Sequence, residues 1–353
     1  MKHFLLLGIW FFTLSTALAD KVDRLIKEEM DKHEIPGLAL VVIKGGKQIK
    51  TAGYGFANLE TKTPATKDTV FEIGSVTKQF TAAAIMILVQ EGKLSVDDKI
   101  SQHLKNTPKI WSDITVRHLL THTSGIKTYT GLDGYELSKH LTQEQFIGQI
   151  GALALDSKPG DKYAYCNTGF NLLGFIIENL SGKKYMDFLG ERIFGPLEMT
   201  STTNREPSII VPNRADGYER VKGGRWINRD SELTDIFSAG AIISTVGDMA
   251  KWDASLNTDK ILTQASKQQM WTAHKLNDGS TKYYGFAWRL EPMDGHKKIA
   301  HTGSTSGFTA SFSRFPDDKM SIIVLCNSGE NEMANIVAKK IAPLYFSDSV
   351  AKN

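Results

Sequence analysis

Cysteine is scarce in this sequence of 353 residues, which contains only Cys166 and Cys326. Two cysteines cannot form the dense disulfide framework of small secreted domains, and a chain of this length can bury a core that needs none. The sequence does not show whether the two sulfur atoms come within bonding distance. We therefore expect two free, buried thiols, with a single disulfide as the alternative.

Concentrated charge is also missing. The 42 Lys and Arg residues nearly balance the 39 Asp and Glu residues, for a formal net charge of +3, and the two signs are mixed along the chain. Because there is no basic stretch interleaved with aromatic residues and no glycine-rich phosphate loop, nucleic acid is not an expected partner. The histidines, including His118 and His122, show no metal-ligand spacing, so neither a metal nor another cofactor is expected.

Long apolar runs are absent except near residue 1. Lys2 precedes the apolar run Phe4–Phe12, and Ala17-Leu18-Ala19 offers the small residues that signal peptidase requires. An uncleaved anchor needs about 20 apolar residues, and polar residues interrupt this run from Thr13 onward. We therefore expect residues 1–19 to be a signal peptide. The mature protein would be periplasmic or secreted and would have no stable membrane span.

Strand-like segments lie towards both ends of the mature chain. A helical pattern over Asp20–Glu34 is followed by two extended segments, Leu38–Ile43 and Gln48–Tyr54, with a glycine turn between them. The last third contains extended segments over Tyr284–Leu290, Lys297–His301, Thr309–Phe315 and Met320–Cys326, and then an amphipathic helix over about Glu330–Leu344. Helical patterns dominate in between, for example at Gln143–Leu153, Gly169–Asn179 and Tyr185–Ile193.

This order predicts an α+β fold. We expect one antiparallel sheet made from the N- and C-terminal thirds, flanked by the N- and C-terminal helices, with a mainly helical lobe inserted. The single domain, residues 20–353, would then have an α/β lobe over about 20–75 and 230–353 and a helical lobe over about 76–229. A cleft between the lobes would be the natural site.

The pattern Ser-x-x-Lys draws attention to one helix. It occurs four times, at Ser75/Lys78, Ser124/Lys127, Ser181/Lys184 and Ser349/Lys352. Only Ser75 follows a short extended segment and a glycine and leads into an apolar helix, where unpaired N–H groups can receive an oxyanion. Lys78 returns to the same helix face one turn later, and apolar surroundings would disfavour its charged form, so it could accept the serine proton. The alternative is a helix cap followed by a solvated lysine.

Two further motifs accompany this pair. Tyr165-Cys166-Asn167 is the one Tyr-x-Asn in the chain and lies just before a predicted helix. His301-Thr302-Gly303 occurs once, at the end of a predicted strand. Each motif alone could be ordinary, but their order along the chain and their places on these elements make them a set.

With these motifs the chain resembles the penicillin-recognising serine hydrolases, which are marked by Ser-x-x-Lys, Tyr-x-Asn or Ser-Asp-Asn, and Lys-Thr-Gly. It is most similar to the group that joins class C β-lactamases, D-alanyl-D-alanine carboxypeptidases of the same fold, D-aminopeptidases and related esterases. The resemblance covers nearly all of the mature chain and includes VRHLLTHTSGI (116–126), PLEMTST (196–202), SAGAIISTVGDMAKW (238–252) and YGFAW (284–288).

The resemblance implies a role for each matching residue. Ser75 would be the acylated nucleophile and Lys78 its activating partner, while Tyr165 would pass the proton to the leaving atom and activate water for deacylation. Whether Lys78 or Tyr165 is the acylation base stays open. Asn167 would hydrogen-bond the acyl-side amide of the substrate. The wall that receives a substrate carboxylate would be formed by His301, Thr302 and Gly303. The oxyanion hole would be formed by the backbone N–H groups of Ser75 and Ser304.

Two residues depart from the family pattern. His301 replaces the usual lysine, as in peptidase and esterase-like members, which disfavours a dedicated β-lactamase. It would attract a carboxylate through charge or, alternatively, donate a hydrogen bond as a neutral imidazole. Cys166 stands where serine is usual, and we expect it to fill space, with a reactive thiol as the alternative.

The sequence therefore predicts an exported, cofactor-free serine hydrolase that cleaves an amide or ester through a Ser75 acyl-enzyme. The substrate would be a small peptide containing a D-amino acid. A promiscuous esterase or weak β-lactamase is one alternative. A slowly deacylating penicillin-binding receptor is another, and the oligomeric state is left open.

Overall fold

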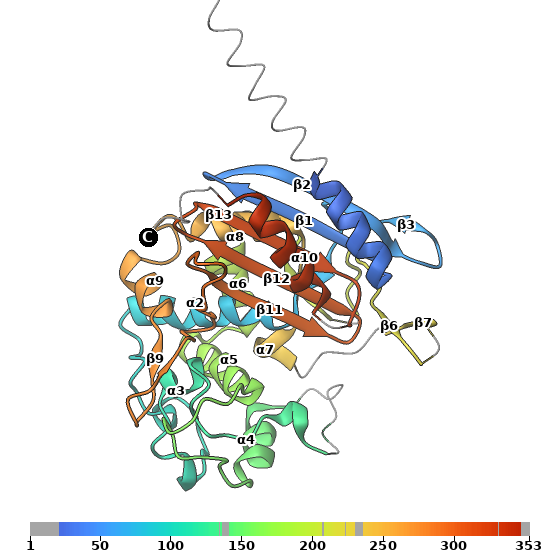
Figure 1. The fold of residues 1–353 in the computed structure, drawn as a ribbon. Coiled ribbons are helices and arrows are strands. Elements are labelled where there is room, and N and C mark those ends of the chain that lie inside the picture. The colour runs from blue at the N-terminus through green and yellow to red at the C-terminus, as the bar shows by residue number, and fades with distance from the viewer. Residues whose placement is uncertain are drawn as a thin grey trace, which may run out of the picture.

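The computed structural model describes residues 21–133, 135, 141–206, 208–222, 224–229, 236–330 and 332–346 (Figure 1). The predicted signal peptide and the Ser349/Lys352 pattern lie outside the described residues. Within these ranges, no helix is long and apolar enough to cross a membrane.

One antiparallel sheet joins the two ends of the chain. Its strand order is β11-β12-β13-β1-β2-β3. The strands are β1 (Gly37–Lys44), β2 (Lys47–Asn58), β3 (Thr63–Pro64), β11 (Ile299–Thr305), β12 (Phe308–Phe315) and β13 (Met320–Cys326). At the centre, β1 pairs with β13 from Leu38↔Cys326 to Lys44↔Met320. The predicted α+β fold, with a sheet from both chain ends, is confirmed.

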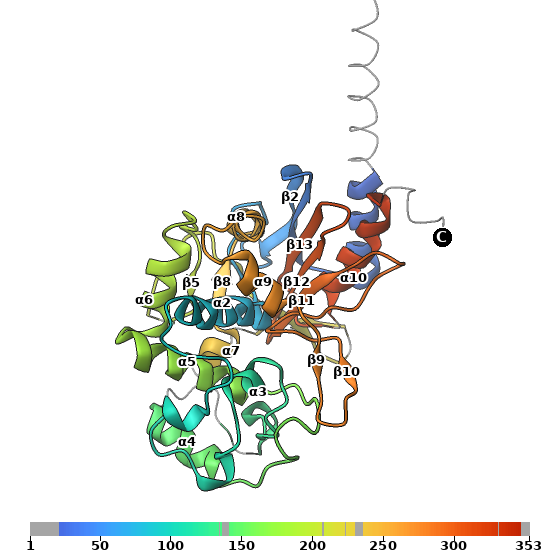
Figure 2. The same cartoon turned by 90° about the vertical axis from the view of Figure 1, so that its left-hand side faces the viewer.

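Helices cover both faces of this sheet (Figure 2). The N-terminal helix, residues 21–33, and α10 (Met333–Ile341) pack on one face, where Val22, Ile26 and Val337 join a buried apolar cluster. On the other face lie α8 (Val246–Ser255) and, beyond it, α2 (Thr77–Gln90). Because both faces are covered, the seven residues of β13 are all buried, and all but Ser321 are apolar.

Helix α2 is the central helix of the molecule. Twelve of its 14 residues are buried, because it lies between the sheet side and the helical region of the chain. A helix that is buried all round needs no polar face, which accounts for its nearly continuous apolar sequence. Helices α5 (Asn167–Ser181), α6 (Tyr185–Leu189) and α7 (Phe237–Gly240) pack against it.

The remaining elements are short. The other helices are α3 (Val116–Leu120), α4 (Gln143–Gly151), α9 (Gln264–Met270), the π-helical turn η5 (Gly190–Phe194) and the 3₁₀ turns η1 (Gly74–Val76), η2 (Ile100–Gln102), η3 (Lys109–Trp111), η4 (Tyr129–Gly131) and η7 (Ala342–Leu344). The other strands are β4 (Phe71–Glu72), β5 (Thr203–Asn204), β6 (Tyr218–Arg220), β7 (Trp226–Asn228), β8 (Ile242–Ser244), β9 (His274–Lys275) and β10 (Thr281–Lys282). Strand β8 pairs with both β4 and β5, and so lies beside the segment that leads into η1.

Two strand predictions need correction. Tyr284–Leu290 is not a strand: Ala287 has a φ of +65°, and the chain folds back so that Tyr284 and Arg289 form an isolated bridge. Strand β11 also runs beyond His301 to Thr305, so His301-Thr302-Gly303 lies inside the strand. The prediction of two free, buried cysteines is confirmed.

A buried ion pair ties α8 to the sheet and can be tested. Asp253 on α8 accepts hydrogen bonds from Arg314 on β12 (2.8 Å) and Ser321 on β13 (2.7 Å). Asp253→Ala should lower the free energy of unfolding by about 3–5 kcal/mol, because it leaves a buried guanidinium unpaired. The matched control is Asp97→Ala, whose carboxylate is 67% exposed and pairs with Arg117. This control should cost less than about 1 kcal/mol. The free energy of unfolding is measured by urea denaturation, and an equal decrease in the two variants would contradict the prediction.

Candidate active site

Ser75 lies in the 3₁₀ turn η1, directly before α2. The turn is possible because Gly74 has a φ of +50°, which a residue with a side chain adopts only under strain. Ser75 is partly exposed, whereas the flanking Gly74 and Val76 are buried. The hydroxyl therefore reaches the surface from a fixed backbone.

Lys78 lies one turn after Ser75 and is completely buried. Its Nζ is 3.0 Å from Ser75 Oγ, 2.8 Å from Asn167 Oδ1 and 2.7 Å from Ala239 O. It also lies 4.9 Å from the centre of the Tyr165 ring. Burial holds the pKa of the Lys78 amine well below its ordinary value.

These contacts decide how a neutral Lys78 amine is oriented. The oxygens of Asn167 and Ala239 can only accept hydrogen bonds, so they take the two amine hydrogens. The nitrogen lone pair is then left facing Ser75 Oγ, from which it can accept a proton. The solvated-lysine alternative does not apply, since the side chain is buried.

Tyr165 and Asn167 approach this pair from the start of α5. The Tyr165 hydroxyl is buried beside Ser75, and among the described residues it has no hydrogen-bond partner of normal geometry. Burial raises the pKa of Tyr165 above its ordinary value, and its interaction with Ser75 opposes that rise. Asn167 is held by Thr128, which accepts from its backbone N–H, and by Thr130, which accepts from its side-chain amide.

Strand β11 forms the other wall of the site. It is an edge strand of the sheet, and it packs directly against η1. A Cβ added at Gly303 would lie 1.9 Å from the Ile73 carbonyl oxygen, and one added at Gly74 would lie 2.7 Å from Ser304 N. The two glycines therefore let the backbones at Ser75 and Ser304 approach closely, as a two-donor oxyanion hole requires.

His301 is buried rather than solvated, with 1% of its surface exposed. Its pKa is lowered to about 3, chiefly by burial and then by the neighbouring Lys78. His301 Nδ1 is 2.6 Å from the Thr302 carbonyl oxygen, and Nε2 is 2.9 Å from the Tyr284 hydroxyl. These contacts favour the neutral imidazole over the predicted charge attraction.

Sequence reasoning missed three residues at this site. His122 and Tyr284 are buried side chains that contact the motif residues, and both had been left without a role. Arg289 is exposed, and its charge acts on Tyr165 and His301. No ion pair or side-chain hydrogen bond is described for its guanidinium in the part of the chain that the structure covers. The position of Arg289 depends on the turn at Ala287, which the predicted strand did not contain.

The Cys166 side chain is engaged with the backbone of another segment. Its thiol is buried and donates to the Ile126 carbonyl oxygen (3.2 Å), and burial raises its pKa to about 11. A protonated, buried thiol is a poor nucleophile, so the contacts favour the space-filling interpretation.

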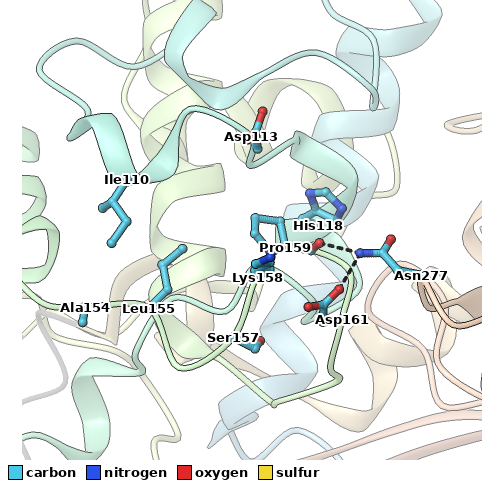
Figure 3. A pocket seen from close by; sticks show the side chains of 10 residues that line it. All are labelled: Ile110, Asp113, His118, Ala154, Leu155, Ser157, Lys158, Pro159, Asp161 and Asn277. Carbon is cyan, nitrogen blue, oxygen red and sulfur yellow. Dashed lines mark hydrogen bonds between the residues drawn. The ribbon is translucent and has the colours of Figure 1, made fainter.

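A separate surface hollow of about 740 Å³ lies in the helical region (Figure 3). Its lining residues are Ile110, Asp113, His118, Ala154, Leu155, Ser157, Lys158, Pro159, Asp161 and Asn277. Asn277 bridges two of them by donating to Pro159 O and Asp161 Oδ1. None of the predicted site residues lines this hollow. Among the described residues, no group of three or more His, Cys, Asp and Glu side chains could hold a metal ion.

The chain is similar to known proteins in sequence and in structure. The family model described as beta-lactamase matches residues 22–344. Penicillin-binding protein 4* of Bacillus subtilis (strain 168) is 30% identical over 322 residues, which are 85% of this chain and 70% of that protein. The octameric penicillin-binding protein homologue from Pyrococcus abyssi superposes with a TM-score of 0.81 at 31% identity, covering 92% of this chain and 77% of that one. D-amino acid amidase from Ochrobactrum anthropi SV3, complexed with L-phenylalanine amide, gives a TM-score of 0.79 at 25% identity, covering 93% and 96% of the two chains.

The protein is therefore an enzyme of the serine hydrolase class. More narrowly, the chain belongs to the beta-lactamase family, because that family's model spans nearly all of the described residues. The predicted family resemblance is confirmed.

The neutral state of His301 can be tested by pH. With a pKa near 3, His301 carries no charge from about pH 5.5 to 8.5 and cannot change its attraction for a carboxylate there. The kcat/KM of a carboxylate-bearing substrate, divided by that of its neutral ester analogue, should stay level over this range. Taking the ratio removes titrations that both substrates share. A ratio that falls as pH rises through about 6.5, the ordinary histidine pKa, would restore the charged alternative.

Proposed function

We propose that this protein is an exported hydrolase that cleaves an amide or ester through an acyl-enzyme on Ser75, and that its substrate is a small peptide containing a D-amino acid. The observation that carries the proposal is the buried Lys78 amine, whose two carbonyl partners leave its lone pair facing Ser75 Oγ. Without such a base, a serine hydroxyl is a weak nucleophile.

The first half of the reaction forms the acyl-enzyme. Ser75 Oγ attacks the substrate carbonyl carbon while its proton passes to Lys78 Nζ, and the carbonyl oxygen becomes an oxyanion that accepts from the N–H groups of Ser75 and Ser304. The tetrahedral species then collapses and the bond to the leaving nitrogen or oxygen breaks. The proton received from serine reaches the leaving atom through the Tyr165 hydroxyl, which lies beside Ser75. The alternative is that Tyr165, rather than Lys78, removes the serine proton.

The second half restores the enzyme. A water molecule attacks the Ser75 ester carbon, and its proton passes to the Tyr165 hydroxyl as that hydroxyl gives its own proton to the neutral Lys78 amine. The ester bond breaks, Ser75 Oγ recovers a proton and a carboxylic acid leaves. Both halves need a neutral Lys78, so activity should be lost as pH falls through its lowered pKa and retained above it.

The substrate class rests on two supports. D-amino acid amidase is among the similar structures, at 25% identity. The exposed guanidinium of Arg289 lies near Tyr165 and His301, where it can attract the carboxylate of a peptide. Because His301 is buried with both ring nitrogens engaged, Arg289 is the charged group that we assign to this attraction, while Thr302 supplies a neutral contact. Asn167, with its amide held by Thr130, would meet the acyl-side amide.

Two alternatives share the same site. A promiscuous esterase or weak β-lactamase would use the same acyl-enzyme. A receptor that deacylates slowly has some support in the similarity to proteins named penicillin-binding proteins. The proposal of export rests on the leader pattern in residues 1–19, which lie outside the described part of the chain.

Ser75→Ala should abolish covalent labelling by a fluorescent penicillin or an activated ester and leave thermal unfolding unchanged, because it removes only a partly exposed hydroxyl. Ser181→Ala is the matched control, since it alters a partly exposed serine of another Ser-x-x-Lys pattern. Labelling that survives Ser75→Ala, or is lost in Ser181→Ala, would contradict the choice of nucleophile. A timed chase of the wild-type label separates the alternatives. Label lost within minutes indicates a hydrolase, and label that persists indicates the receptor.

Arg289→Gln should lower kcat/KM for a carboxylate-bearing D-peptide about tenfold, the equivalent of roughly 1.4 kcal/mol for one charge-assisted contact. The amide or short-chain ester of the same peptide should change less than about twofold, because it has no charge to lose. Lys282→Gln, which removes an exposed positive charge on β10, is the control. Equal effects of Arg289→Gln on the charged and neutral substrates would remove Arg289 from substrate selection.

A further inference from the structure

A continuous line of hydrogen-bonding groups connects the second motif to the third. The backbone N–H of Cys166 donates to His122 Nδ1 (3.0 Å), and His122 Nε2 lies 3.1 Å from the Tyr284 hydroxyl. That hydroxyl lies 2.9 Å from His301 Nε2, and His301 Nδ1 lies 2.6 Å from the Thr302 carbonyl oxygen. The side chains of His122, Tyr284 and His301 are all buried.

The two ends of this line fix the direction of every hydrogen bond in it. A backbone N–H can only donate, so His122 Nδ1 must accept, and the ring proton of a neutral His122 must then be on Nε2. A backbone carbonyl can only accept, so a neutral His301 must carry its proton on Nδ1. The Tyr284 hydroxyl accepts from His122 and donates to His301, and all three side chains are satisfied without a charge.

We propose that His122, Tyr284 and His301 are positioning residues, whose one-directional hydrogen-bond chain holds the Tyr165 loop against strand β11 and keeps both imidazoles neutral beside Lys78. The proposal deepens the function proposed above and rests on it for its catalytic consequence. It assigns opposite tautomers to the two histidines.

The consequence for catalysis is both geometric and electrostatic. The His122 ring packs 4.2 Å, centre to centre, from the Tyr165 ring, and it holds the backbone N–H of the next residue, Cys166. On the other side, the chain ends on the carbonyl of Thr302, two residues before the predicted oxyanion donor Ser304. A shift of either wall would move the proton-transfer group relative to the oxyanion hole.

Protonation of either imidazole would disrupt the chain. A proton on His301 Nε2 would face the Tyr284 oxygen, which already accepts from His122, and the tyrosine hydrogen would lose its acceptor. The positive charge would also lie near Lys78, whose neutral form the reaction needs. The other ionisable groups that act on these three residues are Lys78, Tyr163, Tyr165 and Arg289.

The direct test is nitrogen NMR of the wild-type protein with ¹⁵N-labelled histidine rings, since ring nitrogen shifts distinguish the two tautomers from the cation. Single His122→Gln and His301→Gln variants assign the signals. We expect His122 to be protonated on Nε2 and His301 on Nδ1, with neither titrating from about pH 5 to pH 9. Identical tautomers, or a titration of His301 within that range, would overturn the proposal. This measurement needs no turnover, so it stands even if the proposed substrate or the acyl-enzyme fails.

A kinetic test separates positioning from packing. Tyr284→Phe keeps the ring but removes the hydroxyl that links the histidines, and it should lower kcat for nitrophenyl acetate about tenfold with KM within about twofold. Tyr163→Phe is the matched control, because its ring lies 5.5 Å from that of Tyr284 and no side-chain hydrogen bond of its hydroxyl is described. The control should keep wild-type kcat. Equal losses in the two variants, or no loss in Tyr284→Phe, would contradict a positioning role.

Discussion

The site depends on one contact set, the burial of the Lys78 amine between two carbonyl oxygens. An amine in this position is costly to charge, because burial removes the water that would stabilise the ammonium ion. One carbonyl partner belongs to Asn167 at the start of α5 and the other to Ala239 in α7, and these two helices are far apart in the sequence. Helix α2 must therefore be packed on both sides before its lysine acquires the chemistry of a base.

The packing around α2 follows from that requirement. Thr81, one turn beyond Lys78, donates to the Ser238 carbonyl oxygen and so accepts from the Tyr185 hydroxyl, while Gln79 accepts from Trp252 on α8. The Thr81 hydroxyl and Gln79 Oε1 on this buried helix thus meet partners from other elements, as is usual for buried polar atoms. The same contacts hold the lysine in one orientation.

Charge is distributed so that the interior of the site stays neutral. His122 and His301 are buried with lowered pKa values, and the exposed positive charge near them belongs to Arg289. A charge at the rim can attract a substrate carboxylate without disfavouring the neutral lysine as strongly as a buried charge would. This arrangement also accounts for histidine at a position where lysine is common in the family, since a neutral imidazole can accept from Tyr284 and an ammonium ion cannot.

The sequence by itself determined the sheet from both chain ends, the buried helix α2 and the three motifs, because hydrophobic periodicity and residue spacing are local signals. It distinguished Ser75 from the other serines by the elements around it. Only the tertiary structure decided that His301 is neutral, that His122 and Tyr284 join the motifs, and that Arg289 reaches the rim through the turn at Ala287. The physical reason is that a pKa and a hydrogen-bond partner depend on groups brought together by packing from distant segments, which no spacing along the chain records.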